Sequence, residues 1–549
     1  MAIPQSCTVL VIGGGPAGSY AAAALAREGI DTVLLEADRF PRYHIGESTL
    51  PSLRHFFKFI DFYDTFDAHG FYRKNGAVFR LAQSQPDACT FYTDFLEAGG
   101  PDGYAWNLIR SDFDNLLFRH AGTSGAHIFD ETKVNGIQFE PEVDGPSPEL
   151  RESSKEAFQG SGRPVAATWV RKNGSSGRIA FEYLVDASGR QGLLSTKYLK
   201  NRKFNDNFKS VANWAYWKTD KVHGPGTSME GSPYFEGLTD ASGWAWFMPV
   251  EDNIRSVGIV QDQKLATAKK QHLGRPPTED FYKHCLEMAP GTNKLLSGAE
   301  LTTNIRSASD WSYTASTYHL PHARICGDAG SFIDPLFSSG VHLAVTGGLS
   351  AAATIAASIR GDCDERTAGV WHSKKTVHSY TRFFLAVSSA TKQILIQGTV
   401  DADNTGAVNQ TDFGKIFKFC FKAFTYVPPQ KKEALLEKIE ALGIQAGQLH
   451  TPETLEAIGK HLTDDELQVV ETLRSRRMVR EDPFEMDSFT LDTIDGIAPR
   501  LVRGKLGLTH AEPAKVQGAH FWSTKFLDGK APGIREGSVH LPTSKVQLG

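Results

Sequence analysis

The sequence predicts an α/β protein in which one parallel sheet is built from two distant parts of the chain. An apolar run at residues 8–12 leads through a glycine-rich turn into an Ala-rich segment, and a second apolar run follows at 32–35. A similar pattern returns about 300 residues later, over 323–359. Between them, from about 205 to 315, lies a stretch rich in aromatic residues with strand character. Because continuous apolar runs are typical of buried parallel strands, we expect the two patterns to share a sheet that a second domain interrupts.

The composition is that of an ordinary globular protein. The chain has 549 residues, of which 40% are hydrophobic and 22% charged, and this excludes a wholly disordered chain. The 59 basic and 63 acidic residues give a formal net charge of −4. This even balance gives no electrostatic reason to expect nucleic acid or an anionic membrane as a partner.

The cysteines and the apolar segments indicate a cytoplasmic protein without a stable membrane span. The six cysteines include no C-x-x-C pair, so we expect free thiols in a reducing compartment. The apolar run over 9–25 is broken by several glycines and Pro16, which argues against a signal peptide or a membrane helix.

The turn after the first strand fits the pattern G-x-G-x-x-G. It reads Gly13-Gly14-Gly15-Pro16-Ala17-Gly18. Gly13 permits a tight turn, Gly15 lets a pyrophosphate approach the backbone, and Gly18 allows close packing of helix on strand. The helix N-terminus offers N–H groups to phosphates, and Glu36 can accept hydrogen bonds from ribose hydroxyls. A glycine-rich turn that binds nothing is the alternative, but the strand, turn, helix and acid together predict a Rossmann-type dinucleotide site.

Three further segments make the first 360 residues or so resemble the FAD-binding domain of the aromatic-hydroxylase-like flavoproteins. The acidic turn Gly327-Asp328-Ala329-Gly330 follows the later strand, although alone it is an ordinary β-turn. The segments 186–190 and 42–48 are similar to two other recurrent segments of these proteins. The resemblance implies that FAD is the cofactor, with Ala17, Arg42, Glu47 and Asp328 among its binding residues.

On this basis the chain is expected to divide into four parts. They are the first part of the FAD-binding domain at 1–200, with a mobile insertion near 142–162, a substrate-binding β-sheet domain at 201–315, the second part of the FAD-binding domain at 316–362, and a mostly helical C-terminal region at 363–549.

The segment Gly243-Trp244-Ala245-Trp246-Phe247-Met248-Pro249 resembles the W-x-W-x-I-P motif of flavin-dependent halogenases, with Met248 in the usual Ile position. The resemblance implies that Trp244 and Trp246, followed by Pro249, form a partition between flavin and organic substrate. The alternative is a buried aromatic strand, which is common. Exchange of Ile for Met conserves volume, so the partition stays plausible.

The segment Phe332–Val341 resembles the F-x-x-P-x-x-S-x-G signature of the same family. It directly precedes a predicted helix, so the backbone N–H groups of Ser339 and Gly340 could hold a halide, and that of Val341 could meet the edge of the flavin. A turn and helix cap without a ligand is the alternative.

Lys74, in the segment Gly70–Ala77, matches the catalytic lysine of the halogenases. A lysine between flavin and substrate could hydrogen-bond hypohalous acid or form a chloramine, and burial would lower its pKa. Taken alone, a lysine beside Asn75-Gly76 is a solvated turn residue.

With the segments 485–492 and 499–504, the chain is similar as a whole to the fungal flavin-dependent halogenases of the radicicol and griseofulvin pathway type, which act on free phenolic polyketides. The glutamate of tryptophan halogenases before the motif serine is replaced here by Phe337. An electron-rich phenolate ring needs less activation, so this departure agrees with a phenolic substrate.

The resemblance implies a complete reaction. FADH2 from a separate flavin reductase reacts with O2 to give a flavin hydroperoxide. Chloride or bromide then forms hypohalous acid, which passes the tryptophans to Lys74. The halogen is delivered to the phenolic substrate in secondary-metabolite biosynthesis.

Other functions share parts of these patterns. A flavin monooxygenase that hydroxylates a phenol would share the glycine-rich turn and Asp328. A reductase of isoprenoid double bonds would share the 42–48 segment. A non-catalytic FAD-binding partner of a synthase complex is an alternative of a different class. The motifs around Lys74, Trp244 and Phe332–Val341 favour the halogenase.

Overall fold

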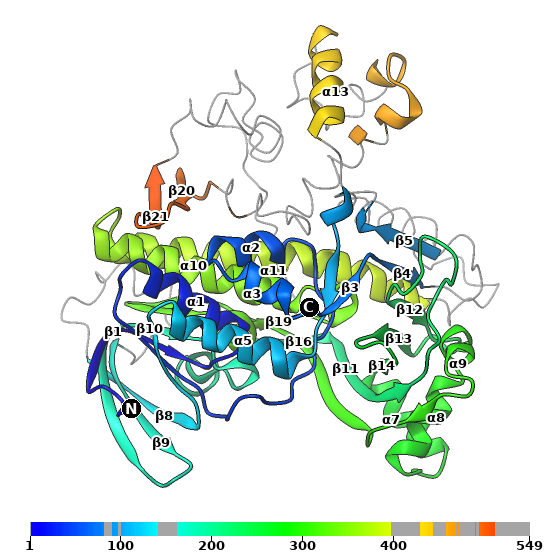
Figure 1. The fold of residues 1–549 in the computed structure, drawn as a ribbon, viewed down its shortest axis with the longest axis horizontal. Helices are drawn as coiled ribbons and strands as arrows, with labels where there is room; N and C mark the ends of the chain where they lie inside the picture. The colour runs from blue at the N-terminus through cyan, green and yellow to red at the C-terminus, as the bar shows by residue number, and fades with distance from the viewer. Residues whose placement is uncertain are drawn as a thin grey trace, which may run out of the picture.

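The computed structural model describes residues 2–81, 90–96, 100–140, 162–396, 429–442, 457–467, 469–470, 489 and 493–510. Two large sheets lie at opposite ends of the view in Figure 1, and the long helices α10 and α11 run across from one to the other. The insertion predicted near 142–162 falls almost wholly outside the described residues.

The first sheet has eight strands, and five of its strands form the parallel core that the sequence predicts. The path runs β17-β18-β10-β1-β2-β7, with β8 and β9 added antiparallel beside β10. β1 pairs in parallel with β2 and β10, and β10 with β18. The strands are β1 (Ser6–Ile12), β2 (Thr32–Leu35), β7 (His127–Phe129), β8 (Thr132–Glu140), β9 (Arg163–Arg171), β10 (Ser176–Asp186), β17 (His319–Leu320) and β18 (Ala323–Ile325). The prediction that the runs at 8–12, 32–35 and 323–326 share one sheet is therefore confirmed.

Helices cover this sheet and extend toward the second one. They are α1 (Pro16–Arg27), α2 (Leu53–Phe59), α3 (Tyr63–Ala68), α5 (Arg110–Thr123), α10 (Gly340–Arg360) and α11 (Glu365–Ile396). α1 packs against α5 and α10, and α10 packs against α11. α10 is long and apolar enough to cross a membrane, but 89% of its apolar window is buried inside the protein. α10 is therefore a core helix of the protein.

The second sheet has nine strands and follows the path β19-β16-β11-β14-β13-β12-β4-β5, with β15 beside β11. Its strands are β4 (Gly76–Arg80), β5 (Thr90–Asp94), β11 (Arg202–Lys218), β12 (Tyr234–Gly237), β13 (Gly243–Pro249), β14 (Ile254–Asp262), β15 (Glu300–Leu301), β16 (Arg306–Ala315) and β19 (Ser331–Phe332). β4, β5 and β19 come from outside the predicted domain at 201–315, so the second sheet takes strands from both sides of this range in the sequence.

Three further helices and a small two-stranded sheet belong to the same part of the structure as the second sheet. The helices are α7 (Gln263–His272), α8 (Thr278–Leu286) and α9 (Pro290–Leu295). The small sheet pairs β3 (Tyr72–Lys74) with β6 (Ala105–Asn107), so Lys74 stands at the end of a short strand.

The C-terminal region contains α11, α13 (Pro429–Ala441) and a β-hairpin made of β20 (Ile497–Arg500) and β21 (Gly507–His510). Figure 1 shows this hairpin beside α10. Glu28 at the end of α1 accepts hydrogen bonds from the backbone N–H groups of Gly504 and Leu506 and from Arg360. The hairpin is thereby joined to the first helix of the chain. Cys7, Cys285, Cys326 and Cys363 are free, while Cys89 and Cys420 lie outside the described residues.

Candidate active site

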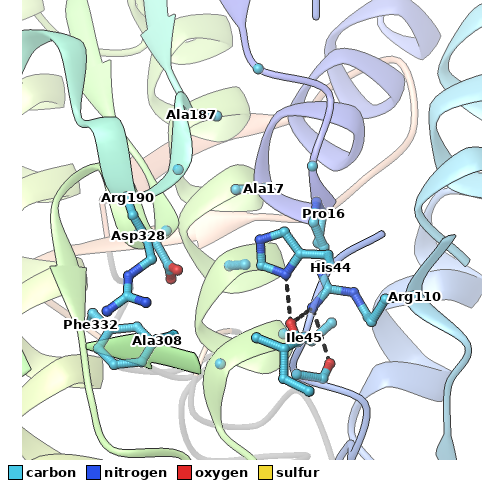
Figure 2. A pocket seen from close by; sticks show the side chains of 18 of the residues that line it. Pro16, Ala17, His44, Ile45, Arg110, Ala187, Arg190, Ala308, Asp328 and Phe332 are labelled. Carbon is cyan, nitrogen blue, oxygen red and sulfur yellow. Dashed lines mark hydrogen bonds between the residues drawn. The ribbon is translucent and has the colours of Figure 1, made fainter. Parts of the chain in front are cut away.

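A cavity of about 500 Å³ lies between the two sheets, and residues of both line it. Figure 2 shows Arg190, Asp328 and Phe332 on one side of it and His44 and Arg110 on the other. The cavity extends from the glycine-rich turn to the paired tryptophans of β13. We call these two regions the nucleotide end and the aromatic end.

The glycine-rich turn forms the nucleotide end as the sequence predicts. Gly13 has φ +101°, and a Cβ there would lie 2.2 Å from the carbonyl oxygen of Ala187, so only glycine fits. Gly15 caps α1, with Pro16 as the first helical residue. A Cβ on Gly15 would meet only the Arg42 guanidinium, at 3.6 Å. The backbone of the turn is therefore open to a phosphate at the helix N-terminus.

The predicted cofactor residues around this turn have different places. Gly13, Gly15, Ala17 and Glu36 line the cavity, whereas Gly14 and Gly18 do not. A Cβ on Gly18 would lie 1.9 Å from the Gly13 carbonyl oxygen, so Gly18 serves close packing. The Glu36 carboxylate accepts hydrogen bonds from the backbone N–H groups of Gly14, at 2.5 Å, and Asp38, at 2.8 Å. These bonds fix Glu36 at the cavity wall.

The 42–48 segment is held against the cavity by an ion-pair network that the sequence analysis missed. Asp114, fully buried in α5, accepts from Arg42 at 2.8 Å and from Arg110 through two bonds. Burial would raise the pKa of Asp114, but the Arg110 and Arg42 guanidiniums hold it below the ordinary value. Arg110 also donates to the carbonyl oxygens of Ile45 and Gly46, as the dashed lines in Figure 2 mark. Both arginines line the cavity beside the loop.

Glu47 is buried and ties the same segment to the second sheet. Its Oε1 accepts a hydrogen bond of 2.5 Å from the Tyr216 hydroxyl of β11. Nearby, Trp214 Nε1 donates to the Tyr43 hydroxyl at 2.6 Å. Burial raises the pKa of the Glu47 carboxyl. The side chains of Tyr43, Glu47 and Trp214 all line the cavity.

The second acidic turn, Gly327–Gly330, lies across the cavity from His44 and Arg110 (Figure 2). Asp328 lines the cavity, and burial raises its pKa although Arg190, Arg110 and Arg202 act in the opposite direction. In Figure 2 the Asp328 carboxyl lies beside the Arg190 guanidinium. Arg190 stacks over the ring of Phe332, 4.7 Å from its centroid.

The aromatic end is built around Trp244 and Trp246, which line the cavity and are buried. Their ring centroids are 5.8 Å apart. Trp246 Nε1 donates to Ser256 Oγ at 3.1 Å. Gly258 of β14 pairs with both Trp214 and Trp246 on the neighbouring strands. A Cβ on Gly258 would lie 2.2 Å from the Trp246 ring, so this glycine makes room for it.

The remaining motif residues flank this end. Met248 lines the cavity and Pro249 does not; the Pro249 carbonyl oxygen instead accepts a 2.8 Å hydrogen bond from Asn107. Phe337 is buried, with its ring 5.3 Å from that of Phe79. Phe337, which replaces the glutamate of tryptophan halogenases, is thus part of an apolar cluster.

The cavity is lined by Ser338 of the turn before α10 and by Gly340 and Val341, the first two residues of that helix. Ser339 between them is buried and does not line the cavity. Ser338 has a left-handed backbone with φ +58°, a conformation that costs a non-glycine residue about 1–3 kcal/mol and often marks a functional site.

Lys74 is only 2% exposed and lies behind the wall of the cavity. Its Nζ donates to Ser48 Oγ and to the Thr49 carbonyl oxygen, both at 2.9 Å, and to Ser338 Oγ at 3.4 Å. Burial lowers the pKa of Lys74 from 10.5 to about 7. Ser48 and Ser338 line the cavity. The structure thus brings Lys74 next to the nucleotide loop and the Phe332–Val341 segment.

Comparison with known proteins adds the family. The family model described as tryptophan halogenase matches residues 8–101 and 102–369, more than half of the chain. The chain belongs to the flavin-dependent halogenases. Sulochrin halogenase gedL of Aspergillus terreus is 48% identical over 97% of this chain and all of its own length. The flavin-dependent halogenase rdc2 of Metacordyceps chlamydosporia is 44% identical over 92% of this chain and 99% of its own.

Solved structures agree with the halogenase fold. The flavin-dependent halogenase CmlS superposes with a TM-score of 0.61 at 26% identity, covering 85% of this chain and 77% of its own. The chondrochloren halogenase CndH has the same fold, with a TM-score of 0.61 at 23% identity, over 92% of this chain and all of its own. The prediction of a fungal-type flavin-dependent halogenase with a Rossmann-type flavin fold is confirmed, and membership of this family favours it over the monooxygenase, isoprenoid reductase and non-catalytic alternatives.

Proposed function

We propose that this halogenase transfers chlorine or bromine to a free phenolic aromatic compound and that Lys74 is the residue through which the halogen passes. The observation that carries the proposal is the position of Lys74. Its amine is buried, touches no carboxylate among the described residues within hydrogen-bond distance, and bonds to Ser48 and Ser338 of the cavity wall.

The residues of the nucleotide end fit FAD. The open backbone at Gly15, the helix N-terminus and the carboxylates of Glu36 and Asp328 are suited to a pyrophosphate, a ribose and a ribityl chain. Arg42, Glu47 and Val341 would border the flavin on the remaining sides. When bound in reduced form, FAD supplies the activation of O2 by which a halide is oxidised to hypohalous acid. As the resemblance to the halogenases implies, a separate flavin reductase would deliver FADH2.

The turn before α10 is suited to a halide. Backbone N–H groups at a helix N-terminus attract anions, and Gly340 and Val341, the first two residues of α10, border the cavity. The N–H groups of Ser339 and Gly340 would hold chloride or bromide there.

The two tryptophans would keep the organic substrate away from the flavin. Trp244 and Trp246 form the aromatic end of the cavity, and Gly258 and Ser256 fix Trp246 against the sheet. Hypohalous acid is smaller than an aromatic substrate and would reach Lys74. Because burial lowers its pKa to about 7, a large share of Lys74 is an uncharged amine at neutral pH. Such an amine can hydrogen-bond hypohalous acid or form a chloramine.

A phenol is the proposed substrate class because Phe337 occupies the position of a glutamate in tryptophan halogenases. Its side chain is buried beside Phe79. A ring that carries a phenol hydroxyl is electron-rich, so it can react without that carboxylate. The relative with 48% identity is a sulochrin halogenase, which supports a secondary-metabolite substrate. The free thiols of the described cysteines support a cytoplasmic site of action.

The test is mass spectrometry of a simple phenolic lactone after incubation with the protein, FAD, a flavin reductase, NADH, O2 and chloride. A product with the isotope doublet of one chlorine is expected, and bromide should compete with chloride for product. A gain of one oxygen in place of a halogen would instead indicate a hydroxylase, and no turnover with bound FAD would contradict an enzymatic role under these conditions.

A further inference from the structure

Three side chains from distant parts of the chain meet behind the cavity wall. Lys74 Nζ donates to Ser48 Oγ at 2.9 Å and to Ser338 Oγ at 3.4 Å, and Ser338 Oγ donates to Ser48 Oγ at 2.9 Å. The two serines line the cavity and Lys74 does not. In the described part of the chain, these hydroxyls are therefore the polar side-chain atoms that touch both the lysine amine and the cavity.

When the donors and acceptors of these three groups are counted, the hydroxyl proton of Ser48 has no acceptor within the group. An ammonium group donates three hydrogen bonds and accepts none, whereas a hydroxyl donates one and accepts two. Ser48 Oγ accepts from both Lys74 and Ser338, so both of its acceptor positions are used. Its own O–H has no acceptor among the hydrogen bonds of the described residues. Because Ser48 lines the cavity, this donor is available to an oxygen or halide there.

Besides the two hydroxyls, Lys74 Nζ donates only to the Thr49 carbonyl oxygen, at 2.9 Å, among the described residues. The strand β6, which pairs with β3, brings no charged residue between Ala105 and Asn107. Glu47, next to Ser48, accepts from Tyr216, and Asp334 accepts from the backbone N–H of Leu336. The ring of Phe95 lies 5.3 Å from Nζ. The amine is thus held by neutral oxygens alone.

The backbone of Ser338 indicates that its contact is maintained at a cost. Its φ of +58° is unfavourable for serine. This conformation ends the turn before α10 and leaves Oγ between Ser48 and Lys74. Strain of this kind persists where surrounding contacts fix it.

We propose that Ser48 both positions Lys74 and relays its proton: the Ser48 hydroxyl fixes the amine behind the cavity wall and passes a proton from the amine to the cavity. The proposal rests on the proposed role of Lys74 in halogenation. When the proton moves, an N–H bond of the Lys74 ammonium breaks and an O–H bond forms at Ser48 Oγ. Ser48 releases its own proton to the oxygen of a hypohalite anion in the cavity. The hypohalite becomes hypohalous acid, Lys74 becomes an uncharged amine, and no electron is transferred.

The first experiment measures the Lys74 pKa in the FAD-free protein, by NMR titration of 13C-labelled lysine with the resonance assigned by its absence in Lys74→Met. Ser48→Ala removes one acceptor of the ammonium, so the pKa should fall by about one unit. Ser48→Thr keeps the hydroxyl and should restore it. Ser338→Ala should have a smaller effect, since that contact is 3.4 Å long. An unchanged or raised pKa in Ser48→Ala overturns the positioning role.

The second experiment uses the FAD-loaded enzyme with flavin reductase, chloride and a phenol. It compares halogenated product with hypohalous acid captured by an added scavenger. In Ser48→Ala, the product share should fall and the captured share should rise, with Ser48→Thr again restoring the balance. A wild-type ratio in Ser48→Ala overturns the relay. If wild-type protein makes neither product nor hypohalous acid, the proposed function fails, and the NMR result still decides the role of Ser48. Ser48→Gly, which also lacks a side-chain acceptor, replaces the alanine variant if that variant does not fold.

Discussion

The glycine-rich turn and the lysine side of the cavity wall are built in different ways. The glycine-rich turn offers backbone groups from one short segment, Gly13–Gly18, placed by φ +101° at Gly13 and by the start of α1. The lysine side is made of side chains: Ser48, Lys74 and Ser338 are separated by 26 and 264 residues along the chain. A backbone site depends on local conformation, whereas a side-chain site depends on how distant segments pack. Substitutions in these two regions should therefore impair the protein in different ways.

The largest effect is expected at the lysine side. Lys74→Met should lower halogenated product by about 10²–10⁴-fold, the usual contribution of a residue in proton or group transfer. FAD affinity should stay as in the wild type, because Lys74 does not line the cavity. Mass spectrometry of product and fluorescence titration of FAD measure the two quantities. Lys172→Met, at an exposed lysine, is the control. Undiminished halogenation would remove Lys74 from the reaction.

Gly13→Ala should weaken FAD binding, which Lys74→Met leaves unchanged. The new Cβ would lie 2.2 Å from the Ala187 carbonyl oxygen, and the φ of +101° disfavours alanine. FAD affinity should fall at least about tenfold, or about 1.4 kcal/mol. Gly29→Ala is a matched control, because Gly29 has φ +76° and open space around its Cβ position. Equal FAD affinity in the two variants would show that the close contact at Gly13 is unimportant.

Gly258→Ala tests the tryptophan pair at the aromatic end of the cavity. Its Cβ would meet the Trp246 ring at 2.2 Å, and overpacking of this kind costs about 1–3 kcal/mol. Urea unfolding should show this loss, and product analysis should show more oxygenated phenol as Trp246 is displaced. Gly459→Ala, where no atom lies within 4 Å of the new Cβ, should leave the free energy of unfolding almost unchanged. A halogenation pattern identical to that of the wild type would mean that Trp246 does not separate flavin from substrate.

The most gradual effect, spread over several pH units, concerns the proton on Lys74. Its pKa is about 7 when folded and 10.5 ordinarily, so between these values the unfolded chain holds a proton that the folded protein lacks. Wild-type stability should therefore rise with pH relative to Lys74→Met, by up to about 1.4 kcal/mol per pH unit. Below pH 7 both states hold the proton, and the difference should level off. Denaturant unfolding at several pH values measures it; a flat difference from pH 7 to 10 would contradict a buried, depressed Lys74.

The contrast between local conformation and the packing of distant segments also decides what the sequence could predict. The strands at 8–12 and 32–35 and the glycine-rich turn were predicted because their signals are local: apolar runs and glycine spacing. Gly258 could have been found, since a lone glycine within a strand indicates a close approach. Ser48 and Asp114 carry no such signal, because their roles arise only from packing across the fold. For the same reason, the assignment of β4 and β5 to the second sheet was not predicted.

The hairpin near the C-terminus has a consequence for synthesis. Glu28 bonds to Gly504 across 476 residues, and Trp371 Nε1 donates to the carbonyl oxygen of Ile497 at 3.0 Å. On the ribosome, the first helix emerges long before these partners exist, and contacts of such long range form slowly. The bonds from Gly504 and Leu506 to Glu28 can therefore form only after residues 493–510 have been synthesised, whereas Arg360, the other partner of Glu28, is made earlier.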